Sequence, residues 1–295
     1  MKAAKYRYLF VVLIILLIFD LIFGYRDRSF YAYFLDVGQG EATLLRTPEG
    51  RYVLIDTGPG RAAYEELSRY FPFGENTIDL LIISHFDNDH IGALPLILQS
   101  YRVNGVIYNE GDPDYKDDWE NYLQPYNRVQ GDIKVGCCVM ISFFENPVVD
   151  SRESNEASLA FRVDYQSLSF FFGGDLPSPE EDLIASAIGD IDVLKVSHHG
   201  SRNSTSKYFV DTIKPEVAII SAGRNNTYGH PHKEVLDIFN MNKIAVERTD
   251  IDGTQVLISD GITMELVSSD GCEQYCSYLI FLKKLLLSDQ SLNYL

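Results

Sequence analysis

Cysteine is scarce in this sequence of 295 residues, which contains four cysteines and a single tryptophan. Cys137 and Cys138 are adjacent, and three residues separate Cys272 from Cys276. Neither spacing is that of a zinc ribbon, which needs paired thiolates at defined intervals. A disulfide in an exported chain and free thiols in the core both fit this pattern, and both alternatives stay open.

Positive charge is also in short supply. Lysine and arginine number 25 against 42 aspartates and glutamates, which gives a formal net charge of -17 at pH 7. This balance argues against a broad basic surface that holds nucleic acid through counterion release. A polyanionic substrate would have to be held locally, by metal ions and a few hydrogen-bond donors.

Internal repeats and low-complexity linkers are missing, and 46% of the residues are hydrophobic. This is the composition of a well-packed globular protein with one large domain or two small ones. Short β-branched runs alternate with segments of helical spacing, which indicates an α/β fold. The stretch 104–150 has weak periodicity and predicts substrate-facing loops around a few short strands.

An apolar run lies near the N-terminus, where three cations precede residues 8–23 and only Asp20 interrupts the run. It is short for a membrane span, which usually takes about 20 apolar residues. The cations are typical of a secretory signal, yet no small-x-small cleavage site precedes Gly24. We expect residues 1–24 to be an uncleaved signal anchor that binds the membrane and places the rest of the chain outside the cytoplasm. Secretion after cleavage is the alternative.

Beyond the anchor, we expect one globular domain over residues 25–270 and a tail over residues 271–295. The tail contains the apolar segment 278–287, which includes two lysines. This pattern predicts a terminal helix that packs on the domain, with a surface-seeking amphipathic helix as the alternative.

One short loop concentrates groups that bind metal ions: His85, Asp87, Asp89 and His90 form an H-x-D-x-D-H motif. It follows a predicted buried strand and precedes a segment of helical length. Ionised carboxylates this close together would lose their hydration if they were buried without partners. A fully solvated loop is the plain alternative, but the motif favours neutralisation by divalent cations.

Similar side chains follow other predicted strands. Asp56, Asp175 and His198 each come after an apolar run. In α/β folds, sites gather beyond the carboxyl ends of strands, so we expect these side chains to converge on the histidine–aspartate loop. All the histidines lie in such turns, at His85, His90, His198, His199, His230 and His232.

The number of candidate ligands predicts two divalent metal ions, because it exceeds what one tetrahedral centre needs. A carboxylate such as Asp175 can bridge two cations, and a pair about 3.5–4 Å apart is typical of phosphoester hydrolysis. Asp87 supplies oxygen where a third imidazole would favour zinc, which shifts the expectation toward manganese and leaves zinc open. The predicted ligands are His85, Asp87, Asp89, His90, Asp175 and His198.

Taken together, these motifs resemble the metallo-β-lactamase fold and, within it, the soluble hydrolase domain of the competence protein ComEC. The resemblance covers roughly residues 30 to 268. It implies an αββα sandwich with the site along one edge, and metal-dependent hydrolysis with DNA as the polymer substrate. Its motifs are Phe34–Glu41, Leu54–Gly58, the histidine–aspartate loop, Ser154–Leu159, Gly174–Asp175, Leu194–Ser201, Asn226–His232 and Arg248–Thr254.

The sequence departs from the ComEC pattern at several points. Glu41 stands where an aspartate is usual, and Ala93 where a second glycine is common. Asn155 occupies a region in which other members of the fold place a further histidine ligand, which weakens the expectation for one metal site. One short apolar run replaces a multi-spanning channel, so the resemblance implies hydrolysis rather than DNA uptake.

The resemblance also implies roles for individual side chains. A water activated by the cations would be the nucleophile. Asp56 is expected to orient an imidazole from behind, and His199 or His230 to protonate the leaving oxygen or hold a phosphate. His85 with Asp87 is expected to hold one metal, Asp89 with His90 and His198 the other, and Asp175 both.

Further polar side chains are expected to donate hydrogen bonds to phosphate oxygens of the substrate. Alternatives exist for two of them. His232 follows a proline and can simply begin a helix, and Ser201 can belong to a cluster of helix caps that extends to Ser206. The predicted substrate-binding residues are Asn155, Ser158, Ser201, Tyr228 and His232.

Three functions are compatible with these residues. The first is an exported, membrane-anchored, metal-dependent phosphodiesterase or nuclease. The second keeps the fold but cleaves a lactam, lactone or thioester. The third is a non-catalytic envelope protein on a retired hydrolase scaffold, which the intact loop and Asp175 argue against, because a retired site has no reason to keep so costly a cluster.

Overall fold

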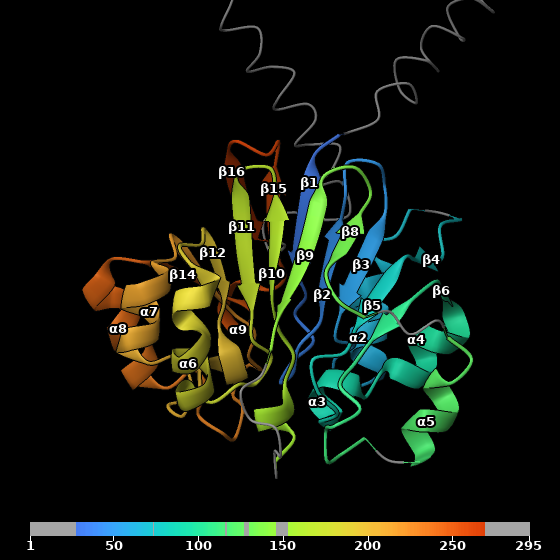
Figure 1. The fold of residues 1–295 in the computed structure, drawn as a ribbon, viewed down its shortest axis with the longest axis horizontal. Helices are drawn as coiled ribbons and strands as arrows, with labels where there is room; N and C mark the ends of the chain where they lie inside the picture. Colours follow the sequence, from blue (N-terminus) through green and yellow to red (C-terminus); the bar gives the residue numbers. More distant parts are fainter. Residues whose placement is uncertain (1–27, 73, 116, 127–129, 146–152, 269–295) are drawn as a thin grey trace, which may run out of the picture.

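The computed structural model describes residues 28–268 except 73, 116, 127–129 and 146–152. Two seven-stranded sheets pack face to face, and helices cover their outer faces (Figure 1). This confirms the expected αββα sandwich. The predicted anchor and the predicted C-terminal helix both lie outside the described residues. Within the described part of the chain, none of the helices has the length and apolar character that a bilayer span requires.

The first sheet has an antiparallel half and a parallel half. Strands β16 to β3 pair antiparallel, and β3, β5 and β7 run parallel. A separate parallel pair, β4 (Thr77–Ile78) and β6 (Arg102–Val103), lies beside it. Across the sheet the order is β16 (Met264–Ser268), β15 (Gln255–Ser259), β1 (Phe30–Phe34), β2 (Thr43–Arg46), β3 (Tyr52–Ile55), β5 (Leu80–Ile82) and β7 (Val106–Ile107).

The second sheet is built in the same way. Strands β8 to β11 pair antiparallel, and β11 to β14 run parallel. Its order is β14 (Ala245–Arg248), β13 (Val217–Ile220), β12 (Val193–Lys195), β11 (Leu168–Phe172), β10 (Ala160–Tyr165), β9 (Val139–Phe144) and β8 (Ile133–Val135).

The β8–β9 hairpin lies in the stretch in which the sequence predicts loops around a few short strands, and it provides two of these strands. Val139 and Ile141 of β9 are buried, whereas Met140 between them is 40% exposed. This alternation is that of a strand with one covered face, but it is too short to stand out in the sequence. A disulfide between Cys137 and Cys138 lies in the hairpin turn.

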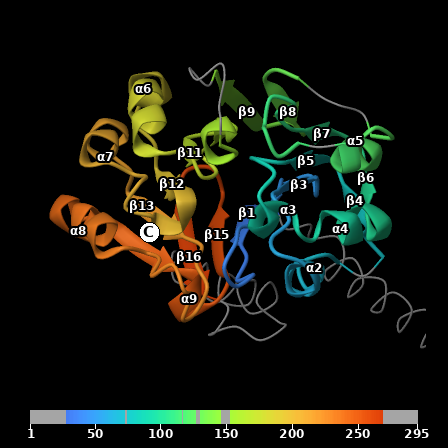
Figure 2. The ribbon, with the colours of Figure 1, turned by 90° about the horizontal axis from the view of Figure 1, so that it is seen from below.

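The helices pack their apolar sides against the outer faces of the two sheets. On the first sheet, Leu67 of α2 and Ile97 of α4 pack in one core with strand residues such as Leu81. On the second sheet, Val235 and Phe239 of α8 are four residues apart and face the same core. Figure 2 shows the two helical layers on opposite sides of the sheets. The helices are α2 (Arg61–Ser68), α3 (Asn88–Ile91), α4 (Leu94–Ser100), α5 (Asp117–Leu123), α6 (Ser178–Ile188), α7 (Lys207–Ile213), α8 (Lys233–Asn242) and α9 (Thr249–Asp252), with the 3-10 turns η1 (Asn155–Ala157) and η2 (Ser197–Gly200).

The layer between the sheets is rich in phenylalanine. Phe30 and Phe34 of β1 meet Phe170 and Phe172 of β11, with ring centroids 5.6 Å and 6.4 Å apart respectively. Every residue of β11 is buried, because sheet covers one face and helices cover the other. The densely packed core fixes the ends of the central strands, which carry the loops described next.

Candidate metal centre

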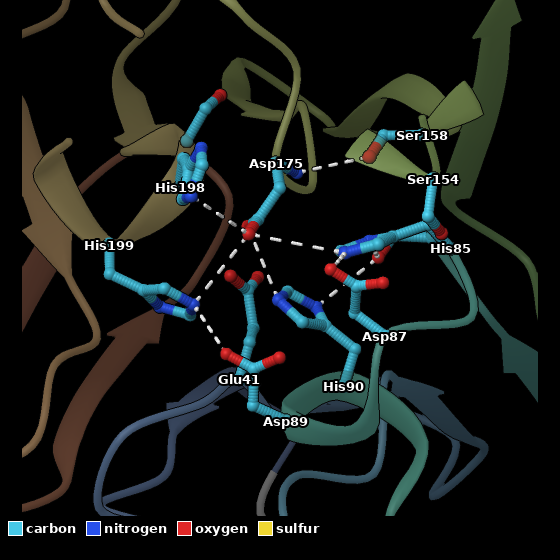
Figure 3. Close-up of polar contacts among 12 residues, drawn as sticks. Glu41, His85, Asp87, Asp89, His90, Ser154, Ser158, Asp175, His198 and His199 are labelled. Carbon is cyan, nitrogen blue, oxygen red and sulfur yellow. Dashed lines mark hydrogen bonds and ion pairs between the residues drawn. The ribbon is translucent and has the colours of Figure 1, made fainter. Parts of the chain in front are cut away.

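Loops from both sheets meet where the carboxyl ends of their strands face each other (Figure 3). In the first sheet, Asp56 follows β3 and the loop from His85 to His90 follows β5. In the second sheet, Asp175 follows β11 and the histidine pair in η2 follows β12. Segments more than 80 residues apart in the sequence therefore contribute to one cluster.

The carboxylate of Asp175 lies at the centre of four imidazole rings. Its Oδ1 atom is 3.2 Å from Nε2 of His90. Its Oδ2 atom is 4.0 Å from Nε2 of His85. The same oxygen is 3.8 Å from Nε2 of both His198 and His199. The structure thus brings the two halves of the predicted ligand set together.

Two further carboxylates flank this centre on opposite sides. Oδ2 of Asp87 lies 3.6 Å from Nε2 of His85, and Oδ2 of Asp89 lies 3.2 Å from Nε2 of His199. Around this centre, potential ligand atoms fall into two groups, and within each group they lie within 4.8 Å of one another. The groups are His85, His90 and Asp175, and Asp89, His90 and His199.

Three buried atoms of the first group support metal binding. Nε2 of His85, Nε2 of His90 and Oδ1 of Asp175 are buried and have no well-aligned hydrogen-bond partner among the described residues, although the last two atoms face each other at 3.2 Å. A buried polar atom without a partner costs about 1–3 kcal/mol. Divalent cations next to these atoms would satisfy all three, and imidazole and carboxylate are both suitable ligands. The donor set therefore fits a metal ion.

Contacts behind the rings indicate which nitrogens carry protons. Nδ1 of His90 lies 2.7 Å from Oδ2 of Asp56, and Nδ1 of His199 lies 3.0 Å from the carbonyl oxygen of Ser221. A carboxylate or carbonyl oxygen can only accept, so both Nδ1 atoms are donors. In a neutral ring this leaves the Nε2 lone pair facing the cluster, as metal ligation requires.

Asp56 therefore lies behind His90, where the sequence predicts an orienting carboxylate. Its Oδ1 accepts from the backbone N–H of Ser84 at 2.7 Å, and its Oδ2 accepts from the hydroxyl of Ser84 at 2.6 Å. These hydrogen bonds fix the position of the Asp56 carboxylate, which in turn orients the ring of His90.

Burial and neighbouring charges shift the pKa values of the cluster in opposite directions. Burial by itself would raise the pKa of Asp175, but His90 and His199 outweigh it and hold the pKa well below its usual range. Burial would likewise lower the pKa of His90, but Asp175 and Asp56 raise it well above its usual range. Imidazolium protons and metal ions are therefore alternative ways to neutralise these carboxylates, and metal binding would displace the protons.

The adjacent histidines of η2 have different surroundings. Both have left-handed backbones, with φ 50° at His198 and 53° at His199. The side chain of His199 is 2% exposed and completes the group with Asp89, whereas that of His198 is 23% exposed and completes neither group. From the sequence, ligation is assigned to His198, and the protonation of the leaving oxygen or the binding of a phosphate to His199, and this geometry favours the reverse.

Three of the other predicted site residues form an outer row beside His198: Tyr228, His230 and His232. The ring of His230 lies 5.7 Å from that of His198 and 4.9 Å from that of His232. Tyr228 is stacked on His230 and is 66% exposed. Burial, followed by the nearby His199 and His198, lowers the pKa of His230 to about 4. This row borders the cluster on its exposed side.

Two predicted substrate donors have structural contacts instead. Ser158 is fully buried, and its hydroxyl accepts from the backbone N–H of Asp175 at 3.1 Å. Gly174 passes so close to Ser158 and Ser84 that a Cβ atom there would lie 3.1 Å and 2.9 Å from theirs, and its φ of 54° also favours glycine. Ser201 is buried and accepts from the N–H of Asn203.

His232 and Asn155 each mark the start of a helix. His232 is the residue before α8, as in the alternative weighed above, and its Nδ1 accepts from the N–H of Arg202 at 3.2 Å. Asn155 begins η1 and is half-buried.

One residue next to the metal loop was not anticipated from the sequence. Asp112 is buried and accepts from the N–H of Phe86 at 2.9 Å and from the hydroxyl of Ser154 at 2.8 Å. It therefore joins the loop of His85 to the turn that carries Ser158. The available signal was its position after β7, but the adjacency of β7 and β5 is a tertiary fact.

Comparison with known proteins agrees with this geometry. The chain is 34% identical over 249 residues to ComE operon protein 3 of Bacillus subtilis (strain 168), covering 75% of this chain and 32% of that protein. It is 37% identical over 223 residues to Recombination protein 2 of Haemophilus influenzae, covering 74% and 27%. The chain thus spans less than a third of these curated relatives. The resemblance to ComEC-like competence proteins is confirmed.

A solved structure shows the same fold at low identity. CmlA, a diiron beta-hydroxylase from Streptomyces venezuelae, matches with a TM-score of 0.54 and 15% identity, covering 81% of this chain and 54% of that one. The family model of the metallo-beta-lactamase superfamily matches residues 35–224, which include the cluster from Asp56 to His199. With its fold and its histidine–aspartate cluster on the same residues, the chain belongs to the metallo-β-lactamase superfamily.

Proposed function

We propose that this chain is a metal-dependent hydrolase that binds two divalent cations around Asp175. The observation that supports this most directly is the ring of imidazole nitrogens around that carboxylate, with three buried polar atoms lacking well-aligned hydrogen-bond partners among the described residues. We assign His85 and Asp87 to one cation, Asp89, His90 and His199 to the other, and Asp175 to both.

The choice of His199 over His198 follows from the contacts of the two rings. The carbonyl of Ser221 holds Nδ1 of His199, and this contact turns its Nε2 toward Asp89 and Asp175. When bound, divalent cations supply Lewis acidity and a nucleophile at neutral pH. The chain itself then has to hold the substrate and the leaving oxygen, and His198 and His230 lie where they can do so.

The proposed substrate is a phosphodiester, with DNA as the polymer. His230 is neutral at pH 7 because its pKa is about 4, so its ring binds phosphate through an N–H rather than through a charge. The names of the two relatives refer to the ComE operon and to recombination, which supports a nucleic acid substrate. The oxygen-rich ligand set favours manganese over zinc. We also propose that residues 1–24 attach the chain to the membrane and that the domain lies outside the cytoplasm.

The deciding experiment measures hydrolysis by the full chain after the metal has been stripped with a chelator. Added manganese or zinc should restore cleavage of DNA and of a small chromogenic phosphodiester. Asp175→Asn should abolish both activities and stoichiometric metal binding. Asp190→Asn is the matched control, because Asp190 is exposed and pairs only with the exposed Lys214 among the described residues.

Two results would contradict the proposal in different ways. Cleavage of a chromogenic lactam, lactone or thioester but of no phosphodiester would leave the fold and metal site intact and move the chain to the second class. Less than one equivalent of metal per chain after supplementation with manganese or zinc would favour a non-catalytic protein.

A further inference from the structure

A row of aromatic rings leads from the metal loop to the protein surface. It starts at Phe86, which lies between His85 and Asp87 in the sequence. The ring of Phe86 lies 5.0 Å from that of Tyr115 and 6.3 Å from that of Trp119. Trp119 in turn lies 5.9 Å from Tyr122. We call Phe86, Tyr115, Trp119 and Tyr122 the aromatic row.

Core packing explains the inner end of this row but not its outer end. Phe86 is 4% exposed and belongs to the core under α2 and α4. Tyr122, on α5, is 47% exposed. A large ring that is half in solvent and contacts a partly buried ring at a tilt of 44° offers exposed aromatic surface to a planar ligand.

The charge of the protein indicates what kind of contact could hold a nucleic acid here. With a net charge of -17, the chain gains little from contacts to a long phosphate backbone. Stacking of bases on aromatic rings provides affinity that does not depend on the phosphates and tolerates any base. Bases of a duplex are stacked on one another, so only an unpaired base can offer its face to Tyr122.

We propose that the aromatic row is a stacking subsite for unpaired nucleobases of a polynucleotide whose phosphodiester lies at the metal cluster. This inference rests on the proposed function, because it names what is held next to the cleaved bond. Phe86 ties the subsite to the cluster, since its backbone N–H is held by Asp112 and its neighbours in sequence are His85 and Asp87. Trp119 and Tyr122 provide the accessible part.

The row contains its own reporter, because Trp119 is the only tryptophan of the chain. The full chain, stripped of metal to prevent cleavage, is titrated with single-stranded oligothymidylate while tryptophan fluorescence is recorded. An abasic oligonucleotide of the same length and charge provides the comparison. The inference predicts that the base-bearing strand quenches Trp119 and that the abasic strand binds and quenches much less.

Variants on two helices separate stacking from general effects. Tyr122→Ala should weaken oligothymidylate binding by about 5- to 150-fold, and Tyr122→Phe, which keeps the ring, should bind as the wild type does. Tyr208→Ala is the matched control, since Tyr208 is 56% exposed on α7 of the other helical layer, and it should change neither binding nor hydrolysis.

Equal quenching by the abasic strand, or unchanged binding by Tyr122→Ala, would overturn the stacking subsite. Neither result would contradict the proposed hydrolase activity, which is tested by a different measurement. Failure of that activity would appear as no cleavage by the wild-type chain, with manganese or zinc, of a small phosphodiester that carries no base.

Discussion

Nζ of Lys195 lies 2.6 Å from Oε2 of Glu41, and the two side chains are only 1% and 2% exposed. The pair joins the second sheet to the first across 154 residues of sequence. Each partner also touches a metal loop. The backbone N–H of Glu41 donates to the carbonyl oxygen of Asp89 at 3.1 Å, and Lys195 ends the strand that leads to His199. The ion pair thus joins the two sheets next to the loops of the candidate metal centre.

We predict that Lys195→Met will destabilise the protein strongly, because it leaves the carboxylate of Glu41 buried without a counter-charge. The free energy of unfolding should fall by about 3–5 kcal/mol in urea titrations. The double variant Lys195→Met with Glu41→Leu should lose clearly less, since no charge remains buried. Lys214→Met removes an exposed lysine paired with Asp190 and should change stability by less than about 1 kcal/mol. Equal losses in the single and double variants would show that the charges are not coupled.

A second prediction separates the neighbouring histidines of η2. His199→Gln should weaken manganese binding by at least the roughly 10- to 100-fold typical of changes beside a metal site. His198→Gln should keep the full number of bound ions and reduce kcat. Isothermal titration with manganese and initial rates on a small phosphodiester measure the two effects. The opposite pattern would return the ligand role to His198.

Glu181 provides a prediction on pH from a carboxyl group outside the metal cluster. It is fully buried on α6, and its carboxylate accepts from the backbone N–H of Thr205. Burial raises its pKa from 4.5 to about 8, and Ser197 and Thr205 offset this only in part. The folded protein therefore binds this proton more tightly than the unfolded chain does. The resulting stabilisation is complete below pH 4.5 and is lost as the pH rises toward 8.

Glu181→Gln should remove this pH dependence, because its amide oxygen can still accept from Thr205 and does not ionise. Relative to the variant, the wild type should lose roughly 3–5 kcal/mol of unfolding free energy between pH 5 and pH 9. Urea titrations with a chelator present measure the difference, and Glu234→Gln on the exposed side of α8 is the control. Parallel pH profiles for wild type and Glu181→Gln would contradict a buried, protonated carboxyl.

Local patterns in the sequence predicted much of the fold and of the cluster. Apolar β-branched runs marked the central strands, and polar groups at their ends marked the side of the sheet on which Asp56 and Asp175 meet the loop of His85. The β8–β9 hairpin was expected only as short strands without definite positions, because strands at or next to a sheet edge have only a few alternating residues. Ser158 was expected to contact substrate, but a hydroxyl beside a functional loop has the same local pattern whether it faces solvent or a backbone N–H.

The sequence by itself determined the α/β class, the histidine–aspartate loop and the number of candidate ligands, because these depend on residue type and on periodicity within single elements. The αββα arrangement was expected only from the resemblance to the metallo-β-lactamase fold. Only the tertiary structure decided that His199 rather than His198 faces Asp89, that Asp112 holds the metal loop, and that Glu41 pairs with Lys195. The physical reason is that the packing of one sheet on the other decides two of these features. It sets the direction in which the His199 side chain leaves its left-handed turn. It also brings Glu41 and Lys195 together, although they are 154 positions apart.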